Sequence, residues 1–88
     1  MTATENFIID GILASQVRAA RGLLAWSQDQ LAESSGVPKR TIARLELNEG
    51  GSHKSTLAAI RTALEAAGVE FITENGGGPG VRLRKASI

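Results

Sequence analysis

Two short amphipathic segments separated by a tight glycine turn constrain the fold of this chain most. The tetrapeptide Ser27-Gln28-Asp29-Gln30 has the form of a capping box, which starts a helix. Gly36 supplies the left-handed residue that ends this helix, and Pro38 suits the first turn of a second helix, which we expect to run to about Leu47. Helices this short are unstable alone in water. The pattern therefore predicts two short helices held at a fixed angle by a surrounding core.

Two further helical patterns flank this pair and supply that core. The first ends near Gly22, with Asp10 as its cap, and the last covers residues 55–67 and ends at Gly68. The residues expected to face inward are Ile12, Leu13, Val17 and Ala20 in the first helix and Leu57, Ile60 and Leu64 in the last. The sequence thus predicts four helices packed around one aliphatic core.

The period of the pattern changes after the last helix. Residues 69–73 and 81–84 alternate as two short strands around a glycine-rich turn, which indicates a β-hairpin. We therefore expect a mainly α fold in three parts, with an N-terminal arm at 1–10, a helical domain at 11–68 and a C-terminal hairpin with its tail at 69–88.

Composition excludes several functional classes. The chain has 88 residues, so there is room for one small core, and only 3% of them are aromatic. The absence of cysteine excludes disulfides and thiolate metal sites and is typical of the reducing cytosol. One histidine, no cysteine and no tyrosine leave no nucleophile–base pair, so we expect neither an enzyme nor a cofactor.

No apolar run approaches the roughly 20 residues of a membrane span, and the first ten residues lack the basic charge of a signal peptide. We expect a cytoplasmic protein.

Charge is segregated along the chain, although the net charge is only +1. Basic residues gather in the second short helix and just beyond it, and again near the C-terminus: Lys39, Arg40, Arg44 and Lys54, then Arg82, Arg84 and Lys85. Such clusters create a local field that attracts an anionic partner. Lys39 begins a helix, where the dipole disfavours a cation, and this favours an external anion. The alternative is that Arg40 and Arg44 are ordinary surface charges that contact only water.

The arrangement of these segments resembles the Cro/C1-type (XRE) family of helix-turn-helix transcriptional regulators. The matching stretches are Val17-Arg18-Ala19-Ala20-Arg21-Gly22-Leu23, Trp26-Ser27-Gln28-Asp29-Gln30-Leu31-Ala32 and Gly36-Val37-Pro38-Lys39-Arg40-Thr41-Ile42-Ala43-Arg44-Leu45-Glu46. The C-terminal stretch is similar to a short alphaproteobacterial type. The resemblance implies a lambda-repressor-like bundle whose second short helix reads the DNA major groove, a groove roughly 12 Å wide.

The resemblance also implies roles for individual residues. Positions in and around the two short helices would contact double-stranded DNA: Gln28, Lys39, Arg40, Thr41, Arg44, Asn48, Ser52, His53 and Lys54. Arg21 and Glu46 would form a structural ion pair between the first helix and the end of the reading helix. With His53 as its one histidine and no cysteine, the sequence predicts no metal site.

Symmetric reading of DNA requires two copies of the chain. A two-stranded hairpin is marginal alone and its edge invites pairing, so we expect Val69, Phe71, Ile72, Val81 and Leu83 to join a homodimer. The alternative is that the hairpin only covers its own core.

The expected function is that of a transcriptional regulator that binds a palindromic operator, and a repressor is favoured over an activator. The rival is an antitoxin or anti-activator that uses the same fold to bind a protein partner.

Overall fold

The computed structural model describes residues 14–47, 54–74 and 76–85. These form four helices and two strands: α1 (Ala14–Leu24), α2 (Gln28–Ser35), α3 (Lys39–Glu46), α4 (Lys54–Ala66), β1 (Val69–Ile72) and β2 (Gly80–Leu83). The expected mainly α bundle with a C-terminal hairpin is therefore confirmed. The expected arm at 1–10, with the Asp10 cap, Ile12 and Leu13, lies outside the described residues.

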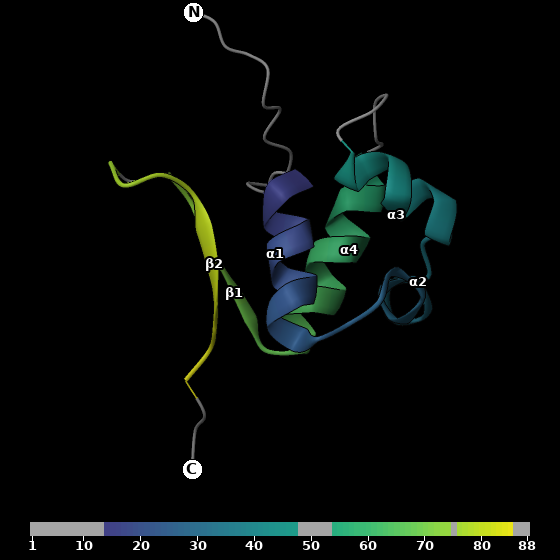
Figure 1. The fold of residues 1–88 in the computed structure, drawn as a ribbon, viewed down its shortest axis with the longest axis horizontal. Helices are drawn as coiled ribbons and strands as arrows, with labels where there is room; N and C mark the ends of the chain where they lie inside the picture. Colours follow the sequence, from purple (N-terminus) through teal and green to yellow (C-terminus); the bar gives the residue numbers. More distant parts are fainter. Residues whose placement is uncertain (1–13, 48–53, 75, 86–88) are drawn as a thin grey trace, which may run out of the picture.

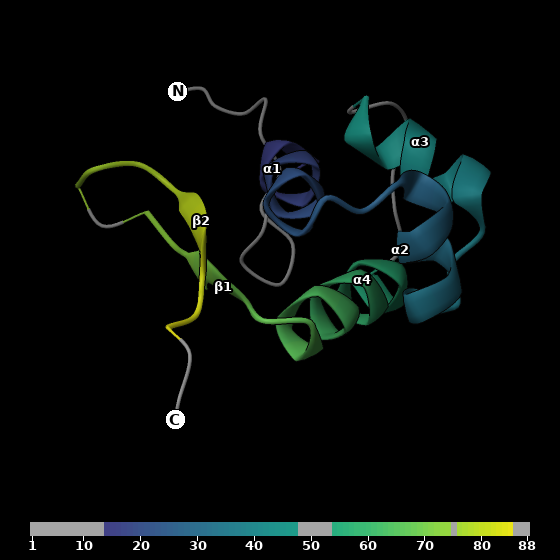
Figure 2. The same ribbon diagram turned by 60° about the horizontal axis from the view of Figure 1, so that its bottom comes forward.

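The helices and the hairpin are arranged in sequence across the molecule. Helices α1 and α4 lie side by side in the middle, with the hairpin against one side and the α2–α3 pair against the other (Figures 1 and 2). In the described part of the chain no helix is long and apolar enough to cross a membrane. Helix α3 and the hairpin are thus at opposite ends of the bundle.

The core is aliphatic, as the composition predicts, and the four helices and β1 contribute to it, while Val81 of β2 packs against it. Its fully enclosed members come from all four helices and from β1: Val17, Ala20, Leu31, Ile42, Ile60, Leu64 and Val69. Phe71 of β1 is the aromatic side chain within this cluster, and Trp26 packs against the cluster from outside. Because β1 supplies core residues, the hairpin is an integral part of the helical domain.

Local sequence signals fix both ends of α2. The Ser27 hydroxyl accepts the Gln30 amide at 3.1 Å and the Gln30 side chain accepts the Ser27 amide at 2.7 Å, which completes the expected capping box. Gly36 ends the helix with φ 77°, in the left-handed region. Pro38 takes the N-cap position of α3 and not its first turn, because its ψ of 143° is extended. The two helices therefore meet at a turn whose geometry is set by Gly36 and Pro38.

The end of α1 differs from the expectation. The helix continues through Gly22 to Leu24, and Ala25 takes the left-handed conformation with φ 57°. The Trp26 amide then bonds to the Arg21 carbonyl at 2.9 Å and the Ala25 amide to that of Gly22 at 3.2 Å. This is a Schellman termination with alanine where glycine is usual. The expected end near Gly22 is therefore wrong, because the residue that ends the helix is not a glycine.

Replacing Ala25 with glycine should therefore stabilise the protein. A non-glycine residue in the left-handed region costs about 1–2 kcal/mol of stability, which the glycine would recover. The added conformational freedom of glycine in the unfolded chain reduces this gain by about 0.4–1 kcal/mol. We expect a net gain of roughly 0.5–1 kcal/mol, which raises Tm by about 4 °C in a domain of this size. Gly36→Ala is the matched control: open space surrounds its position, so its expected loss of stability is conformational. Thermal unfolding of both variants with the same sign of effect would contradict this account.

The hairpin is antiparallel and docks on α1 through a buried glutamine. Val69 pairs with Leu83 and Phe71 with Val81, so these apolar residues share one face of the hairpin. Gln16 of α1 is 3% exposed, and its amide nitrogen donates to the carbonyls of Gly80 at 2.9 Å and of Ile72 at 3.3 Å. This glutamine holds both strands against the helix. No periodicity of the sequence pointed to it.

Candidate nucleic-acid interface

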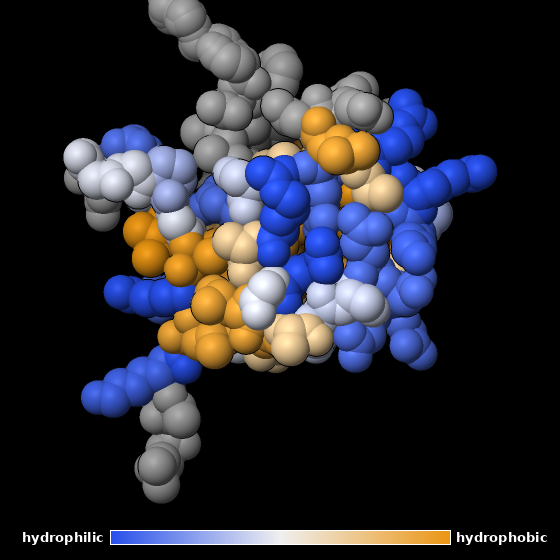
Figure 3. All heavy atoms as spheres, in the orientation of Figure 1, coloured by the Kyte–Doolittle hydropathy of each residue, from blue (hydrophilic) through white to orange (hydrophobic). Residues whose placement is uncertain are grey.

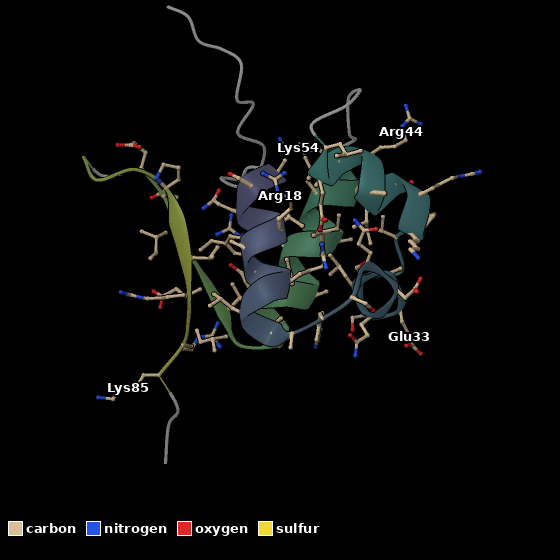
Figure 4. All side chains as sticks on the ribbon, in the orientation of Figure 1. Arg18, Glu33, Arg44, Lys54 and Lys85 are labelled. Atoms are coloured by element: carbon tan, nitrogen blue, oxygen red, sulfur yellow. The ribbon has the colours of Figure 1, made fainter. Side chains whose placement is uncertain are left out.

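Helix α3 presents a cationic face to solvent. Its buried side consists of Ile42, Leu45 and Glu46, whereas Lys39, Arg40 and Arg44 are exposed. Arg40 and Arg44 are four residues apart and so lie on the same side of the helix. Figure 4 shows Arg44 projecting away from the bundle, and Figure 3 shows hydrophilic side chains covering this end of the molecule. The two arginines are placed to reach an external partner.

Lys39 has an anionic neighbour within the chain. Its ammonium group lies 3.4 Å from the Asp29 carboxylate in the first turn of α2, and both side chains are exposed. Asp29 offsets the unfavourable dipole of the α3 N-terminus at Lys39. The inference of an external anion from this position alone is therefore weaker than the sequence suggested. An exposed pair of this kind is worth at most about 1 kcal/mol, so it is easily exchanged for another anion.

The Glu46 carboxylate joins three elements at the end of α3. Arg21 of α1 donates from Nε at 2.7 Å and from Nη2 at 2.8 Å, and Gln28 of α2 donates from Nε2 at 3.0 Å. The remaining Arg21 nitrogen, Nη1, donates to the Trp26 carbonyl at 2.9 Å. Glu46 is only 3% exposed. The ion pair implied by the family resemblance is thus a bidentate contact that fixes α3 relative to α1 and α2.

Electrostatics keep this buried carboxylate charged. Burial alone would raise the pKa of Glu46, but hydrogen bonds from Arg21 and Gln28, with the charges of Arg21 and Arg18, hold the pKa below its ordinary value. The same hydrogen bond to Glu46 raises the pKa of Arg21 against the effect of its burial. Both partners are therefore ionised at neutral pH, and α3 is held by a charge-assisted contact.

Gln28 has a supporting contact in addition to its expected role at phosphate. It is the first residue of α2, half-buried, and one hydrogen of its amide nitrogen is used on Glu46. An amide nitrogen carries two hydrogens, so the second is left to donate elsewhere. Gln28 can therefore link an anion outside the protein to the carboxylate that positions α3.

Two further cations flank α3, and sequence reasoning missed one of them. Arg18 of α1 is exposed, and its guanidinium donates to the Glu46 carbonyl at the end of α3. Lys54 begins α4 and is exposed. Figure 4 shows Arg18, Lys54 and Arg44 toward the same upper side of the bundle, with Glu33 on the lower side. Arg18 lies one helical turn before Arg21, and the helical period therefore places both arginines on the side of α1 that faces the end of α3.

The other predicted contact residues are only partly placed by the structure. Thr41 is half-buried on α3. Asn48, Ser52 and His53 lie outside the described residues. Among the described residues, no three histidine, aspartate or glutamate side chains gather as metal ligands.

Comparison with known proteins agrees with this arrangement. Residues 17–69, from the first turn of α1 to the start of β1, match the protein family described as Helix-turn-helix. The chain belongs to the Cro/C1-type helix-turn-helix family. It is 37% identical over 68 residues to Control protein C.SmaI of Serratia marcescens, an alignment that covers 77% of this chain and 81% of that protein. The protein is therefore a DNA-binding transcriptional regulator of a family that is not enzymatic, and α2 and α3 are its helix-turn-helix.

The structure changes the set of residues available for a homodimer. Val69 and Phe71 are enclosed in the core of the chain itself. They cannot form an interface between chains without leaving that core. Ile72 and Val81 are half-buried, and Leu83 is 48% exposed. Of the five hairpin residues predicted to dimerise, three therefore keep accessible surface.

Proposed function

We propose that this regulator binds a palindromic operator as a homodimer and represses transcription from it. Each α3 would lie in the major groove of one half-site, with Arg40 and Arg44 at base edges. The observation that carries the proposal is the exposed cationic face of α3, held by a buried bidentate ion pair. A helix that discriminates bases must be held rigidly, and the contacts of Glu46 supply that rigidity for α3. The similarity to a protein named as a control protein supports a regulatory role.

The residues around α3 divide into readers and positioning contacts. Lys39, Gln28 and Lys54 would donate to phosphates on either side of the groove, which fixes register without reading sequence. Arg18 adds a fourth such contact from α1. Asn48, Ser52 and His53 keep the backbone-contacting role implied by the family. Thr41 would contact a phosphate or a thymine methyl group at the groove wall.

Protection mapping on the DNA upstream of the gene itself tests this function. A symmetric dimer should protect two half-sites whose centres are about 10–10.5 base pairs apart, or a multiple of that spacing, because each half-site faces the same side of the duplex. A promoter reporter that falls in the presence of the protein would establish repression. Protection of one asymmetric half-site would contradict dimeric reading, and uniform weak protection of any DNA would contradict sequence-specific reading.

Removing the hairpin is not a usable test of dimerisation. A chain that ends at Gly68 would lack Val69 and Phe71 and would lose part of its core as well as any interface. Loss of one large core side chain typically costs about 2–5 kcal/mol. Point substitutions on the accessible face of the hairpin are therefore needed to separate association from folding.

A further inference from the structure

The outer edge of β2 has backbone groups that point away from its own hairpin. The Arg84 amide bonds to the Gly68 carbonyl at 2.7 Å, so this opposing pair is hydrogen-bonded. Hydrogen-bonded pairs alternate along an antiparallel ladder, which makes Glu70–Arg82 and Ile72–Gly80 the next ones. The amide and carbonyl groups of Val81 and Leu83 must then point outward.

The contacts of Gln16 agree with this assignment. One amide nitrogen reaches the carbonyl oxygens of both Ile72 and Gly80. If these residues formed a non-hydrogen-bonded pair, their carbonyls would point to opposite outer edges, and a single nitrogen could not reach both. The oxygens therefore lie between the strands. In the described residues, no backbone hydrogen bond to the outward groups of Val81 and Leu83 is found.

An apolar surface adjoins this edge. Leu83 is 48% exposed, and Leu23 near the end of α1 is 42% exposed. Gln16 contacts Gly80, and both α1 and β2 run in the same direction from this point (Figure 1), which brings Leu23 level with Leu83. Figure 3 shows apolar side chains gathered over β2 and the lower end of α1. The exposed positions earlier on α1 include the small residues Ala19 and Gly22, which allow close approach.

We propose that β2 pairs with β2 of a second copy of this chain, antiparallel, with the two-fold axis at Arg82. The inference rests on the homodimer proposed above and assigns its interface. Val81 of one protomer exchanges two hydrogen bonds with the partner's Leu83, and the symmetry operation repeats the exchange. The result is a continuous four-stranded sheet in the order β1-β2-β2-β1, with α1 of each protomer beneath its centre.

The register follows from the backbone. A two-fold axis at Val81 would oppose Leu83 to Pro79, which has no amide hydrogen to donate. An axis at Leu83 would oppose Val81 to Lys85, beyond the end of β2. Only an axis at Arg82 lets both Val81 and Leu83, whose backbone groups point outward, form hydrogen bonds to residues of the partner's β2. It also places Val81 beside the partner's Leu83, an apolar cross-strand pair on the face that looks toward the helices.

The position of the reading helix favours the same arrangement. The two-fold axis between antiparallel strands of one sheet is perpendicular to that sheet. Helices α1 and α4 cover one face of the sheet, and α3 lies beyond them (Figures 1 and 2). Rotation about such an axis leaves both α3 helices on the same side of the dimer. This is the geometry that reading two half-sites on one face of DNA requires.

Charge at the axis is balanced within each protomer. Arg82 points to the outer face of the hairpin, where its Nε lies 3.0 Å and its Nη2 3.3 Å from the Glu70 carboxylate. Two Arg82 side chains meeting at the axis would repel each other. Each has its own glutamate as a counter-charge, so the central pair is tolerated.

Cysteine cross-linking tests the register. The natural chain has no cysteine, so Arg82→Cys introduces a single thiol at the proposed axis. Opposed residues of a non-hydrogen-bonded antiparallel pair have Cα atoms about 4.5 Å apart, within the range of about 4.4–6.8 Å that a disulfide spans. We expect mild oxidation to convert most of the chain to a covalent dimer that a reductant reverses. Lys85→Cys, on the same chain segment but three residues from the axis, should cross-link at least tenfold more slowly.

A second variant tests the interface without a thiol. Leu83→Lys places a charge on the edge and, because Leu83 is half-exposed, leaves the fold intact. We expect its dimer dissociation constant, from light scattering over a dilution series, to rise at least tenfold. Leu47→Lys, at another exposed leucine, is the control that should leave association unchanged.

The outcomes separate this inference from the proposed function. Faster cross-linking through Lys85→Cys than through Arg82→Cys, or an unchanged dissociation constant for Leu83→Lys, would overturn the β2 interface. The operator protection measured with the unmodified protein would stand in either case. Loss of protection in the unmodified protein would instead overturn the proposed function, whatever the cross-linking shows.

Discussion

Glu46→Ala should lower the free energy of unfolding by about 3 kcal/mol. Removing one partner of a buried ion pair leaves the other charge without compensation and costs roughly 3–5 kcal/mol. The lower end applies here because the Arg21 side chain keeps 21% exposure and can be partly rehydrated. Gln28 would also lose its acceptor. Urea unfolding followed by circular dichroism measures the change, with a matched decrease in Tm.

A double-mutant cycle separates the pair from its surroundings. Once Glu46 is gone, Arg21→Ala should cost little more, because the guanidinium keeps only its hydrogen bond to the Trp26 carbonyl. Glu65→Ala is the control: its pair with Arg61 lies on α4 with both side chains about one-third exposed, and its expected effect is at most about 0.5 kcal/mol. The coupling would be refuted if the double variant lost as much free energy of unfolding as the Arg21→Ala and Glu46→Ala variants together.

The same contact makes stability depend on pH on the acid side. The pKa of Glu46 in the folded chain lies below its ordinary value of 4.5. Its contribution is therefore fully present above pH 4.5 and is lost as pH falls through the folded-state pKa. The hydrogen bond from Arg82 lowers the pKa of Glu70 as well, so both groups titrate in this window. The difference between the natural chain and Glu46→Gln isolates the part that belongs to Glu46.

Local chemistry explains why so much of the fold could be read from the sequence. The capping box at Ser27 and the left-handed Gly36 act within a few residues of themselves, so their effect does not depend on the rest of the chain. The inward stripe of α4 needs only the helical period. Where a residue type and a backbone conformation agree, as at Gly36, the sequence alone predicts the structure.

The features that sequence reasoning missed depend on contacts between distant segments. Gln16 is a polar residue in a helix and gains its role only where two strands meet 56 and 64 residues later. Ala25 adopts a left-handed conformation that its residue type disfavours, because the surrounding hydrogen bonds impose it. Alternation showed that Val69 and Phe71 share a face but could not show which surface covers it. Burial against α1 and α4 answers that question.

The reading helix carries the prediction with the greatest consequence for function. Arg40→Ala and Arg44→Ala should each weaken binding to the operator by about 1–3 kcal/mol, if the arginine makes a bidentate contact with guanine. This corresponds to roughly 5- to 150-fold in Kd. Both side chains are exposed on α3 and outside the contacts of Glu46, so the variants should keep the Tm of the natural chain. Lys85→Ala removes a cation at the opposite end of the molecule and should leave affinity within about twofold (Figure 4).

Salt dependence decides which contact each arginine makes. A phosphate contact contributes equally to operator and random DNA, and its loss reduces the slope of log Kd against log salt by about one unit. A base contact contributes to the operator alone, so its loss narrows the ratio between operator and random DNA. We expect substitution of Arg40 or Arg44 to narrow the ratio between operator and random DNA. We expect substitution of Arg18 or Lys54 to reduce the salt slope. If neither arginine variant alters binding to any DNA, α3 is not the reading helix, and the cationic face described above must serve another partner.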